Sequence, residues 1–174
     1  MARVRRSKDQ LFLLLCALIG AGIAVYLTFV HYDQVPLACS GTGLINCGLV
    51  LASPYSVVPG TTLPITIPGL AWCLCMAALA SAGLYASAQR RWLRLAQFAW
   101  ALVGMLTVLY LVYIEIVRLH TICAWCSALH VLILLMFLVT LVQLQPQPST
   151  EVELERVENE AVGAARNSHP PHAR

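Results

Sequence analysis

Four of the seven cysteines stand at spacings that suit thiol–disulfide chemistry. Cys123 and Cys126 form a Cys-Ala-Trp-Cys motif, and two thiols three residues apart on a helix share a face and can close a small disulfide. The amino terminus of a helix also stabilises a thiolate, the nucleophile of disulfide exchange, through its partial positive charge and free N–H groups. We therefore predict that this motif opens a helix and that one of its thiols is activated.

The second pair is Cys39 and Cys47, which are separated by seven residues in the segment LACSGTGLINCGLV. Gly41 and Gly43 lie between them and give the segment conformational freedom. A fixed dithiol and a mobile one together predict a relay. In it, the mobile pair meets a soluble partner and passes electrons to the fixed pair through a transient disulfide between the pairs.

The composition of the chain that must position these pairs is that of a membrane protein. Its 174 residues are 59% hydrophobic and only 11% charged, which is too apolar for a soluble protein of this length. A bilayer core about 30 Å thick requires about 20 apolar residues per helix, and four such stretches are present. They are residues 11–30, 68–88, 92–117 and 121–142. We predict an all-α integral membrane protein, a bundle of four transmembrane helices.

Two of these stretches have charged residues at or near one end. Basic residues precede the first one, as in a cleaved signal sequence, but its apolar run is long enough to span the membrane and favours a retained anchor. The third contains Glu115, within a turn of Arg118, and we expect its long side chain to reach the membrane interface.

Basic residues indicate the orientation, because short loops rich in Lys and Arg stay in the cytoplasm. They are Arg3, Arg5, Arg6 and Lys8 before the first span, and Arg90, Arg91 and Arg94 between the second and third. Both termini are therefore predicted to be cytoplasmic. The first loop, which has no Lys or Arg, and the turn at residues 118–121 then lie on the other side. All four cysteines of the two pairs fall there, where disulfides persist, and this favours redox pairing.

The predicted organisation has three parts. Residues 1–9 form a basic cytoplasmic amino terminus, and residues 10–143 form the membrane domain. Within it, the non-cytoplasmic redox loop 31–67 is apolar and proline-rich after its cysteines, and we expect it to cap the mouth of the bundle. Residues 144–174 form an acidic, partly disordered cytoplasmic tail, helical from about 150 to 165, without a catalytic role. The remaining cysteines, expected to pack as small apolar side chains, are Cys16, Cys73 and Cys75.

Electrons that reach Cys126 need an acceptor. The sequence has no flavin or nicotinamide fingerprint, no haem-attachment CxxCH and no cytoplasmic cysteine relay. A lipid-soluble quinone, ubiquinone or menaquinone, is the acceptor that remains, and an oxidising periplasm is maintained through a quinone. His130 lies four residues after Cys126 on the same helix face. It is a candidate to hydrogen-bond a quinone carbonyl, and the alternative is a hydrogen bond to another helix.

Together these residues resemble the vitamin K epoxide reductase family, including its bacterial homologues. The resemblance rests on Cys39 and Cys47, on Ser53 six positions after the second cysteine, and on the CxxC of Cys123 and Cys126 opening the last bundle helix. It covers residues 10–143, which is the whole membrane part.

The resemblance implies a role for each of these residues. Cys39 would exchange disulfides with the partner, Cys47 would form a disulfide with Cys123, and Cys126 would be the thiolate beside the quinone. Ser53 would help to hold the capping segment or the quinone, and His130 falls where some relatives have a tyrosine that contacts the quinone. Bacterial relatives often carry a fused thioredoxin-like domain, and this chain has none. A separate thioredoxin-like partner of the DsbA type is therefore implied, at a bacterial inner (cytoplasmic) membrane.

We therefore expect a quinone-dependent thiol–disulfide oxidoreductase that supports disulfide bond formation, with no nucleic-acid partner. Reduction of vitamin K epoxide or quinone is the alternative activity. A DsbB-like protein would carry its quinone-side CxxC early in the chain, whereas here it opens the last helix. Two other classes are a metal-binding membrane protein with four thiolate ligands and a tetraspan scaffold braced by disulfides. Structural zinc sites tend to have two tight CxxC knuckles, and this chain supplies only one, so no metal is expected.

Overall fold

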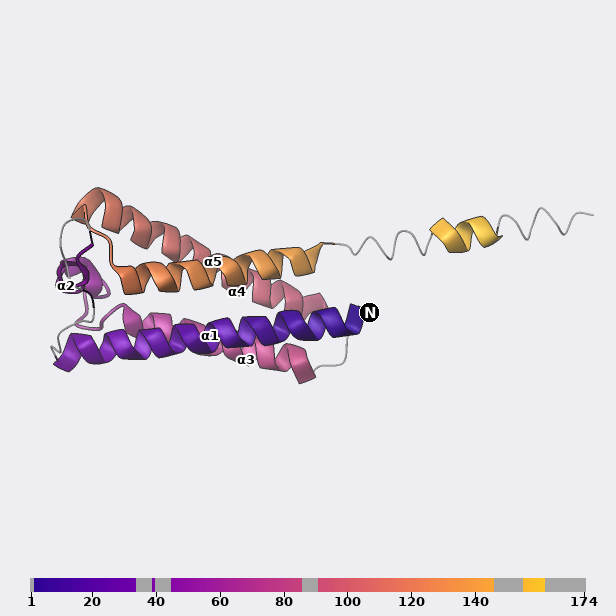
Figure 1. Cartoon of the computed structure of the whole chain (residues 1–174), viewed down its shortest axis with the longest axis horizontal. Coiled ribbons are helices and arrows are strands. Elements are labelled where there is room, and N and C mark those ends of the chain that lie inside the picture. The colour runs from indigo at the N-terminus through magenta and orange to yellow at the C-terminus, as the bar shows by residue number, and fades with distance from the viewer. Residues whose placement is uncertain (1, 34–38, 40–44, 86–90, 146–154, 162–174) are drawn as a thin grey trace, which may run out of the picture. The chain divides into compact units, whose positions relative to one another are not determined.

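A computed structural model describes residues 2–33, 39, 45–85, 91–145 and 155–161 of the chain (Figure 1). The chain divides into two compact units, Met1–Leu144 and Gln145–Arg174. In the second unit the described residues 155–161 are helical and exposed, and Arg156 and Glu160 form an ion pair at 4.0 Å. The rest of the predicted tail lies outside the described residues.

The first unit is a bundle of four long helices, α1 (Ala2–Asp33), α3 (Thr66–Tyr85), α4 (Arg91–Tyr113) and α5 (Ala124–Leu144). Four segments within them are long and apolar enough to cross a membrane: Ser7–Asp33, Thr66–Tyr85, Arg91–Leu119 and Ala124–Leu144. This confirms the predicted fold class of four transmembrane helices. Between α1 and α3, the short helix α2 (Cys47–Leu51) and the 3-10 turn η1 (Pro54–Ser56) cover one end of the bundle (Figure 1).

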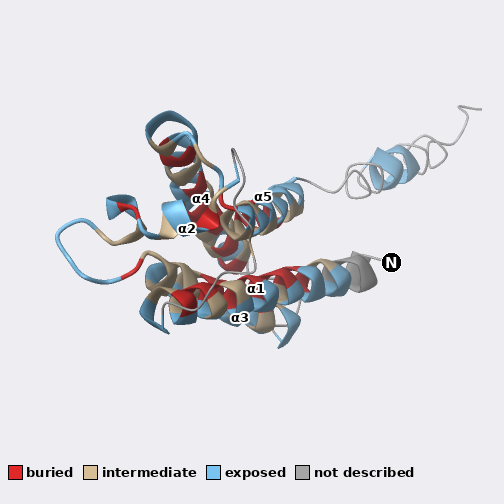
Figure 2. Ribbon diagram, turned by 60° about the vertical axis from the view of Figure 1, so that its left-hand side comes forward, coloured by how far each residue is buried: buried red, intermediate tan, exposed pale blue. Residues whose placement is uncertain are grey.

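The helices pack mainly as two pairs, α1 on α3 and α4 on α5, and contacts of α1 with α5 and of α3 with α4 join the pairs. Figure 2 shows the buried residues on the helix faces that meet and the exposed residues on the outer faces. The core contains many small side chains, which let neighbouring helix backbones approach each other closely. Close packing matters in a membrane because the hydrophobic effect does not drive helices together in lipid. The small side chains include Ala17, Ala24, Ala80 and Ala101, beside Leu13, Met76 and Met136.

Three glutamines tie the helices together at the end of the bundle away from α2. The Gln10 and Gln97 side chains donate to each other, at 3.2 and 2.8 Å, and Gln10 also donates to the Gln143 side chain at 3.1 Å. Gln97 donates in addition to the carbonyl of Leu79 in α3, at 3.0 Å. Because buried amides in a membrane must find partners within the protein, this network joins all four helices.

The third and fourth helices differ from expectation where they meet. α4 continues as the π-helical segment η2 (Ile114–Leu119), and α5 begins at Ala124, so that Cys123 precedes the helix. Glu115, expected at the interface, is only 6% exposed, and that expectation was wrong. In η2, the Glu115 carbonyl accepts the N–H groups of His120 and Thr121, and the side chain lies on the bundle side of the chain.

Trp72 of α3 and Trp100 of α4 hold their helices together through a reciprocal pair of hydrogen bonds. Each indole N–H donates to the backbone carbonyl of the other residue, at 3.1 Å in both cases. Gly104 lies beside this pair, and a Cβ at that position would overlap the six-membered ring of Trp72. The contact between α3 and α4 therefore requires glycine at position 104.

We predict that Gly104→Ala destabilises the protein by about 1–3 kcal/mol, because the added methyl group forces the Trp72 ring out of its place. The melting temperature of the purified protein in detergent measures this effect. Gly22→Ala is the matched control, since a Cβ on Gly22 meets no atom within 4 Å. Equal melting temperatures for the two variants would contradict this role of Gly104.

Candidate functional site

The two cysteine pairs meet at the end of the bundle that α2 covers. Cys39 and Cys47 form a disulfide, and Cys47 is the first residue of α2. The residues before it run beside the residues before Cys123. Ile45 and Ile122 form a parallel bridge, and the Asn46 N–H donates to the Ile122 carbonyl at 3.2 Å. This pairing brings Cys47 next to the start of α5, and both Cys47 and Cys123 are fully buried.

Local hydrogen bonds set the start of α2. The Asn46 side chain accepts the N–H of Leu49 at 3.0 Å, which is the usual bond of an asparagine that caps a helix. Asn46 thus uses its backbone N–H to reach Ile122 and its side chain to begin the helix that carries Cys47. One residue fixes both the position of the loop and the direction of its inner sulfur.

Cys123 occupies the capping position of α5. Its carbonyl accepts the N–H of Ser127 at 2.8 Å, and its sulfur accepts the backbone N–H of Cys126 at 3.3 Å. Cys123 and Cys126 are both free thiols. The structure therefore contains an oxidised loop pair beside a reduced inner pair, whose first sulfur lies at the positive end of a helix.

The environment of Cys123 favours its thiolate. A hydrogen bond from the Cys126 thiol, with the backbone N–H groups of Cys126 and Trp125, holds the pKa of Cys123 below its ordinary value. Burial and the nearby Glu115 carboxylate act in the opposite direction but are outweighed. The sequence predicted one activated thiol at this helix terminus, and on geometry it is Cys123.

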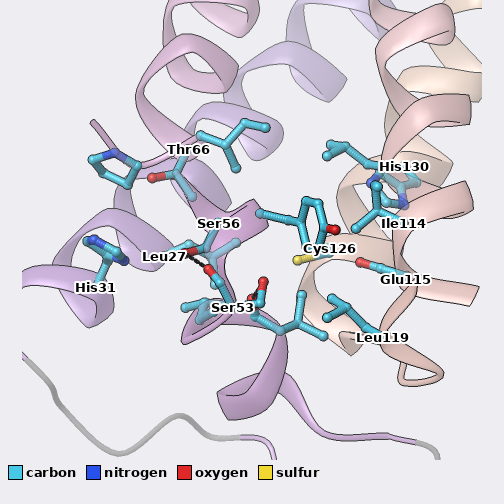
Figure 3. A pocket seen from close by; sticks show the side chains of 16 residues that line it. Leu27, His31, Ser53, Ser56, Thr66, Ile114, Glu115, Leu119, Cys126 and His130 are labelled. Atoms are coloured by element: carbon cyan, nitrogen blue, oxygen red, sulfur yellow. Dashed lines mark hydrogen bonds between the residues drawn. The ribbon is translucent and has the colours of Figure 1, made fainter. Parts of the chain in front are cut away.

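A small cavity of about 70 Å³ lies below the capping segment, next to Cys126 (Figure 3). Its polar lining comes from every part of the site: His31 of α1, Ser53, Ser56 and Thr66 of the capping segment and α3, Glu115 of η2, and Cys126 and His130 of α5. In Figure 3, the Cys126 sulfur and the Glu115 carboxyl point into the same space. The cavity gathers ionisable groups around one thiol.

A larger cavity of about 450 Å³ adjoins the small one, and Cys126 and His130 line both. Its other walls are mostly apolar and aromatic, from all four long helices. They include Leu27, Trp72, Cys75, Trp100, Gly104, Val108, Leu111, Leu129 and Ile133. An apolar cavity of a few hundred cubic ångströms with few polar groups is typical of a small-molecule site, and here Cys126 lies where the smaller and larger cavities meet.

Ser53 and His130 both lie at this site. Ser53 is 9% exposed, and its hydroxyl donates to the Val50 carbonyl at 2.7 Å, while its own carbonyl accepts the Ser56 hydroxyl at 2.8 Å. These bonds join α2 to η1 and hold the capping segment over the cavity. His130 is equally buried and lies one helical turn beyond Cys126.

The other cysteines lie outside the redox pairs. Cys16 and Cys73 are buried in the bundle, and Cys75 is half-buried at the wall of the larger cavity; all three are free thiols. Within the described part of the chain, no group of three or more His, Cys, Asp or Glu is arranged to hold a metal ion.

Sequence reasoning missed Glu115 as a member of the site. A single acidic residue in an apolar span was the available signal, since such residues usually face the interior of a bundle. Its closeness to Arg118 in the sequence suggested the interface instead, and the π-helical turn that moves it inward has no recognisable pattern.

We predict that Cys126→Ala raises the pKa of Cys123, because the hydrogen bond that most favours the Cys123 thiolate is lost. The thiolate of Cys123 then forms only at higher pH than in the unchanged protein. Titration of the thiolate ultraviolet absorbance of the reduced protein, taken as a difference from the Cys123→Ser variant, measures the shift. Cys126→Ser keeps a hydroxyl donor and is expected to shift the titration less. A Cys123 titration that Cys126→Ala leaves unchanged would rule out this hydrogen bond as the cause.

Comparison with known proteins agrees with this geometry. The profile of the Vitamin K epoxide reductase family matches residues 11–141, a range that contains most or all of each of the four bundle spans and both cysteine pairs. No curated protein sequence matches the chain. The match covers most of the chain and confirms the resemblance that the cysteine spacings indicated, so this chain belongs to the vitamin K epoxide reductase family.

Proposed function

We propose that this membrane oxidoreductase oxidises a thioredoxin-like partner through Cys39 and Cys47. It then passes the electrons to Cys123 and Cys126 and reduces a membrane quinone, and so supports disulfide bond formation. The observation that carries the proposal is the docking of the loop disulfide against the start of α5, through the Asn46–Ile122 hydrogen bond. Family membership supports oxidoreductase activity. The contact between the loop and the start of α5 supports the proposed path of electrons from the loop pair to the inner pair.

The exposure of the two loop cysteines supports their division of roles. Cys39 is partly exposed, whereas Cys47 is fully buried beside Cys123. Cys39 is therefore the sulfur that a soluble protein can reach. The partner gives up two thiol hydrogens and two electrons and becomes a disulfide, and the Cys39–Cys47 bond is broken to two thiols.

The inward step is a second exchange. The Cys47 thiolate attacks the sulfur of Cys123 in an oxidised Cys123–Cys126 pair and releases the Cys126 thiolate. Cys39 then attacks Cys47, which restores the loop disulfide and releases Cys123. The result is an oxidised loop pair and a reduced inner pair, the same arrangement of bonded and free sulfurs that the structure contains.

The two adjoining cavities fit a quinone as the electron acceptor. The larger one has the size and apolar lining for a lipid-soluble ring, and Cys126 and His130 lie where it joins the smaller cavity. When bound there, a ubiquinone or menaquinone supplies a two-electron acceptor. Cys126 would be the thiol in contact with it, His130 a hydrogen-bond donor, and Ser53 would keep the capping segment in place.

The distribution of basic residues in the sequence supports a proposal for where the reaction occurs. With both termini in the cytoplasm, the cysteine end of the bundle faces the other side of a bacterial inner membrane, where a separate thioredoxin-like protein of the DsbA type is available as the partner.

The first test concerns the entry of electrons. We predict that Cys47→Ser accumulates a mixed disulfide at Cys39, because the thiol that would resolve it is missing. The probe is a thioredoxin-like protein that keeps only its nucleophilic cysteine, activated as a mixed disulfide with thionitrobenzoate. A shifted band on a non-reducing gel, lost on addition of reductant, measures the product. Cys39→Ser is the matched control and should give no such band; a band of equal strength there would refute Cys39 as the entry point.

The second test concerns the exit of electrons. Purified protein supplied with the reduced thioredoxin-like protein and a short-chain ubiquinone or menaquinone should form quinol, followed by the absorbance of the quinone. Cys126→Ala should reduce this rate to background, since no thiol remains in contact with the acceptor. Cys16→Ala is the control, because Cys16 is a buried free thiol of α1 that lies outside both pairs and is not among the residues that line either cavity. Quinol formation that survives Cys126→Ala would overturn the proposed role of this thiol.

A further inference from the structure

Within the part of the chain whose side chains the structure describes, Glu115 is an acidic side chain buried in a span without a basic ion-pair partner. It is 6% exposed. Among the residues whose side chains the structure describes, the only ion pair is that of Arg156 and Glu160, while Arg118 on the same segment is exposed. Burying a carboxyl group near lipid is costly, and such residues usually serve a function.

The position of Glu115 depends on the π-helical turn at the end of α4. The extra residue in a π-helical turn changes the face that a side chain presents, and such turns occur often at functional sites. Here the Glu115 carbonyl accepts the Thr121 N–H at 3.2 Å, and its side-chain carboxyl interacts with the backbone of Cys123. One residue thus closes the turn before α5 and contacts the redox motif.

The carboxyl group is also close to both inner sulfurs. Its charge acts on Cys123 and on Cys126, and it lines the smaller cavity together with Cys126 and His130 (Figure 3). That cavity is large enough for a water molecule to connect the carboxyl to a thiol or to a group bound beside Cys126. A proton acceptor therefore lies within reach of the thiol that contacts the electron acceptor.

We propose that Glu115 is the proton carrier between the Cys126 thiol and the electron acceptor, an inference that rests on the proposed function. Two S–H bonds break and the Cys123–Cys126 bond forms, while two electrons and two protons are transferred to the quinone oxygens. The Glu115 carboxylate takes the proton of Cys126 and gives it to one of those oxygens, which returns Glu115 to its starting form. The proton of Cys123 is released to water, and the second oxygen takes up a proton from water.

Several other titratable groups lie at or beside the same cavity as Glu115 and contribute to the pH dependence of the reaction there. They are His31 of α1, Tyr55 of η1, Cys123, and Cys126 and His130 of α5. Glu115 differs from the imidazole and phenol groups among them, because it contacts the backbone of the redox motif and its charge acts on both inner sulfurs.

The test is Glu115→Gln in the full-length protein. The amide of glutamine can still interact with the Cys123 backbone, so the turn before α5 is kept, but the side chain no longer carries a proton. We expect quinol formation to fall about 100-fold, the lower range for loss of a general acid–base group. Disulfide exchange between the loop pair and the inner pair should continue at the original rate. The limb of the pH–rate profile that depends on the carboxyl group should disappear, and Glu115→Asp should recover part of the rate.

Three results would overturn the inference. Quinol formation at the original rate and with the original pH profile in Glu115→Gln would show that the carboxyl carries no proton. Equal loss of quinol formation and of disulfide exchange would show that Glu115 only holds the turn. If the unchanged protein forms no quinol while its loop pair still exchanges disulfides with the thioredoxin-like probe, the proposed acceptor is wrong and the proton role is rejected with it.

Discussion

The hydrogen bond from the Asn46 N–H to the Ile122 carbonyl is the contact on which the proposed relay depends. It joins two segments far apart in the chain through backbone atoms, so it does not require particular side chains. Cys47 and Cys123 directly follow the paired residues, and both are fully buried. The proposed exchange needs these two sulfurs close together, and the pairing brings their backbone segments side by side without a covalent bond between them.

The opposite end of the bundle holds the helices in the orientation that this contact requires. Helix association in lipid gains little from the hydrophobic effect, so polar contacts and close packing must set how each helix is turned. The amides of Gln10, Gln97 and Gln143 connect α1, α4 and α5, and Gln97 also bonds α3. Because helices are stiff, a rotation fixed at one end is kept at the other. Cys126, His130 and Glu115 therefore face one cavity rather than lipid.

The sequence was sufficient for the parts of the fold that depend on general constraints. Bilayer thickness determines the length of an apolar span, and all four helices follow from it. The approach of Cys39 and Cys47 to Cys123 and Cys126 followed from span count and charge distribution, two properties that need no knowledge of packing. The start of α5 was predicted three residues too early, because the apolar run of the sequence extends beyond the helix to residue 121.

Details that depend on local geometry could not be predicted. Glu115 was expected at the interface, because its spacing from Arg118 does not reveal a π-helical turn. The larger cavity has walls that come from all four long helices, and the Trp72 ring in its wall packs against a glycine in α4. Neither feature has a sequence signature, since both arise from how helices pack. Glu115, whose position was predicted wrongly, is also the residue for which we propose a function. This is expected, because chains often depart from regular helical geometry at functional sites.

The hydrogen bonds at Cys123 give the proposed relay a direction. In thiol–disulfide exchange, a sulfur with a lower thiol pKa leaves faster, and a dithiol whose thiolate is stabilised holds electrons more firmly. Cys123 receives the Cys126 thiol and two backbone N–H groups, so it is a good leaving group when Cys39 attacks the disulfide between Cys47 and Cys123. Cys47, the first residue of a five-residue helix, has no matching set of donors among the bonds of the described residues. These donors support the proposed direction, from the loop pair to the inner pair. The bundle end that buries Cys123 also provides the hydrogen-bond donors on which that direction rests.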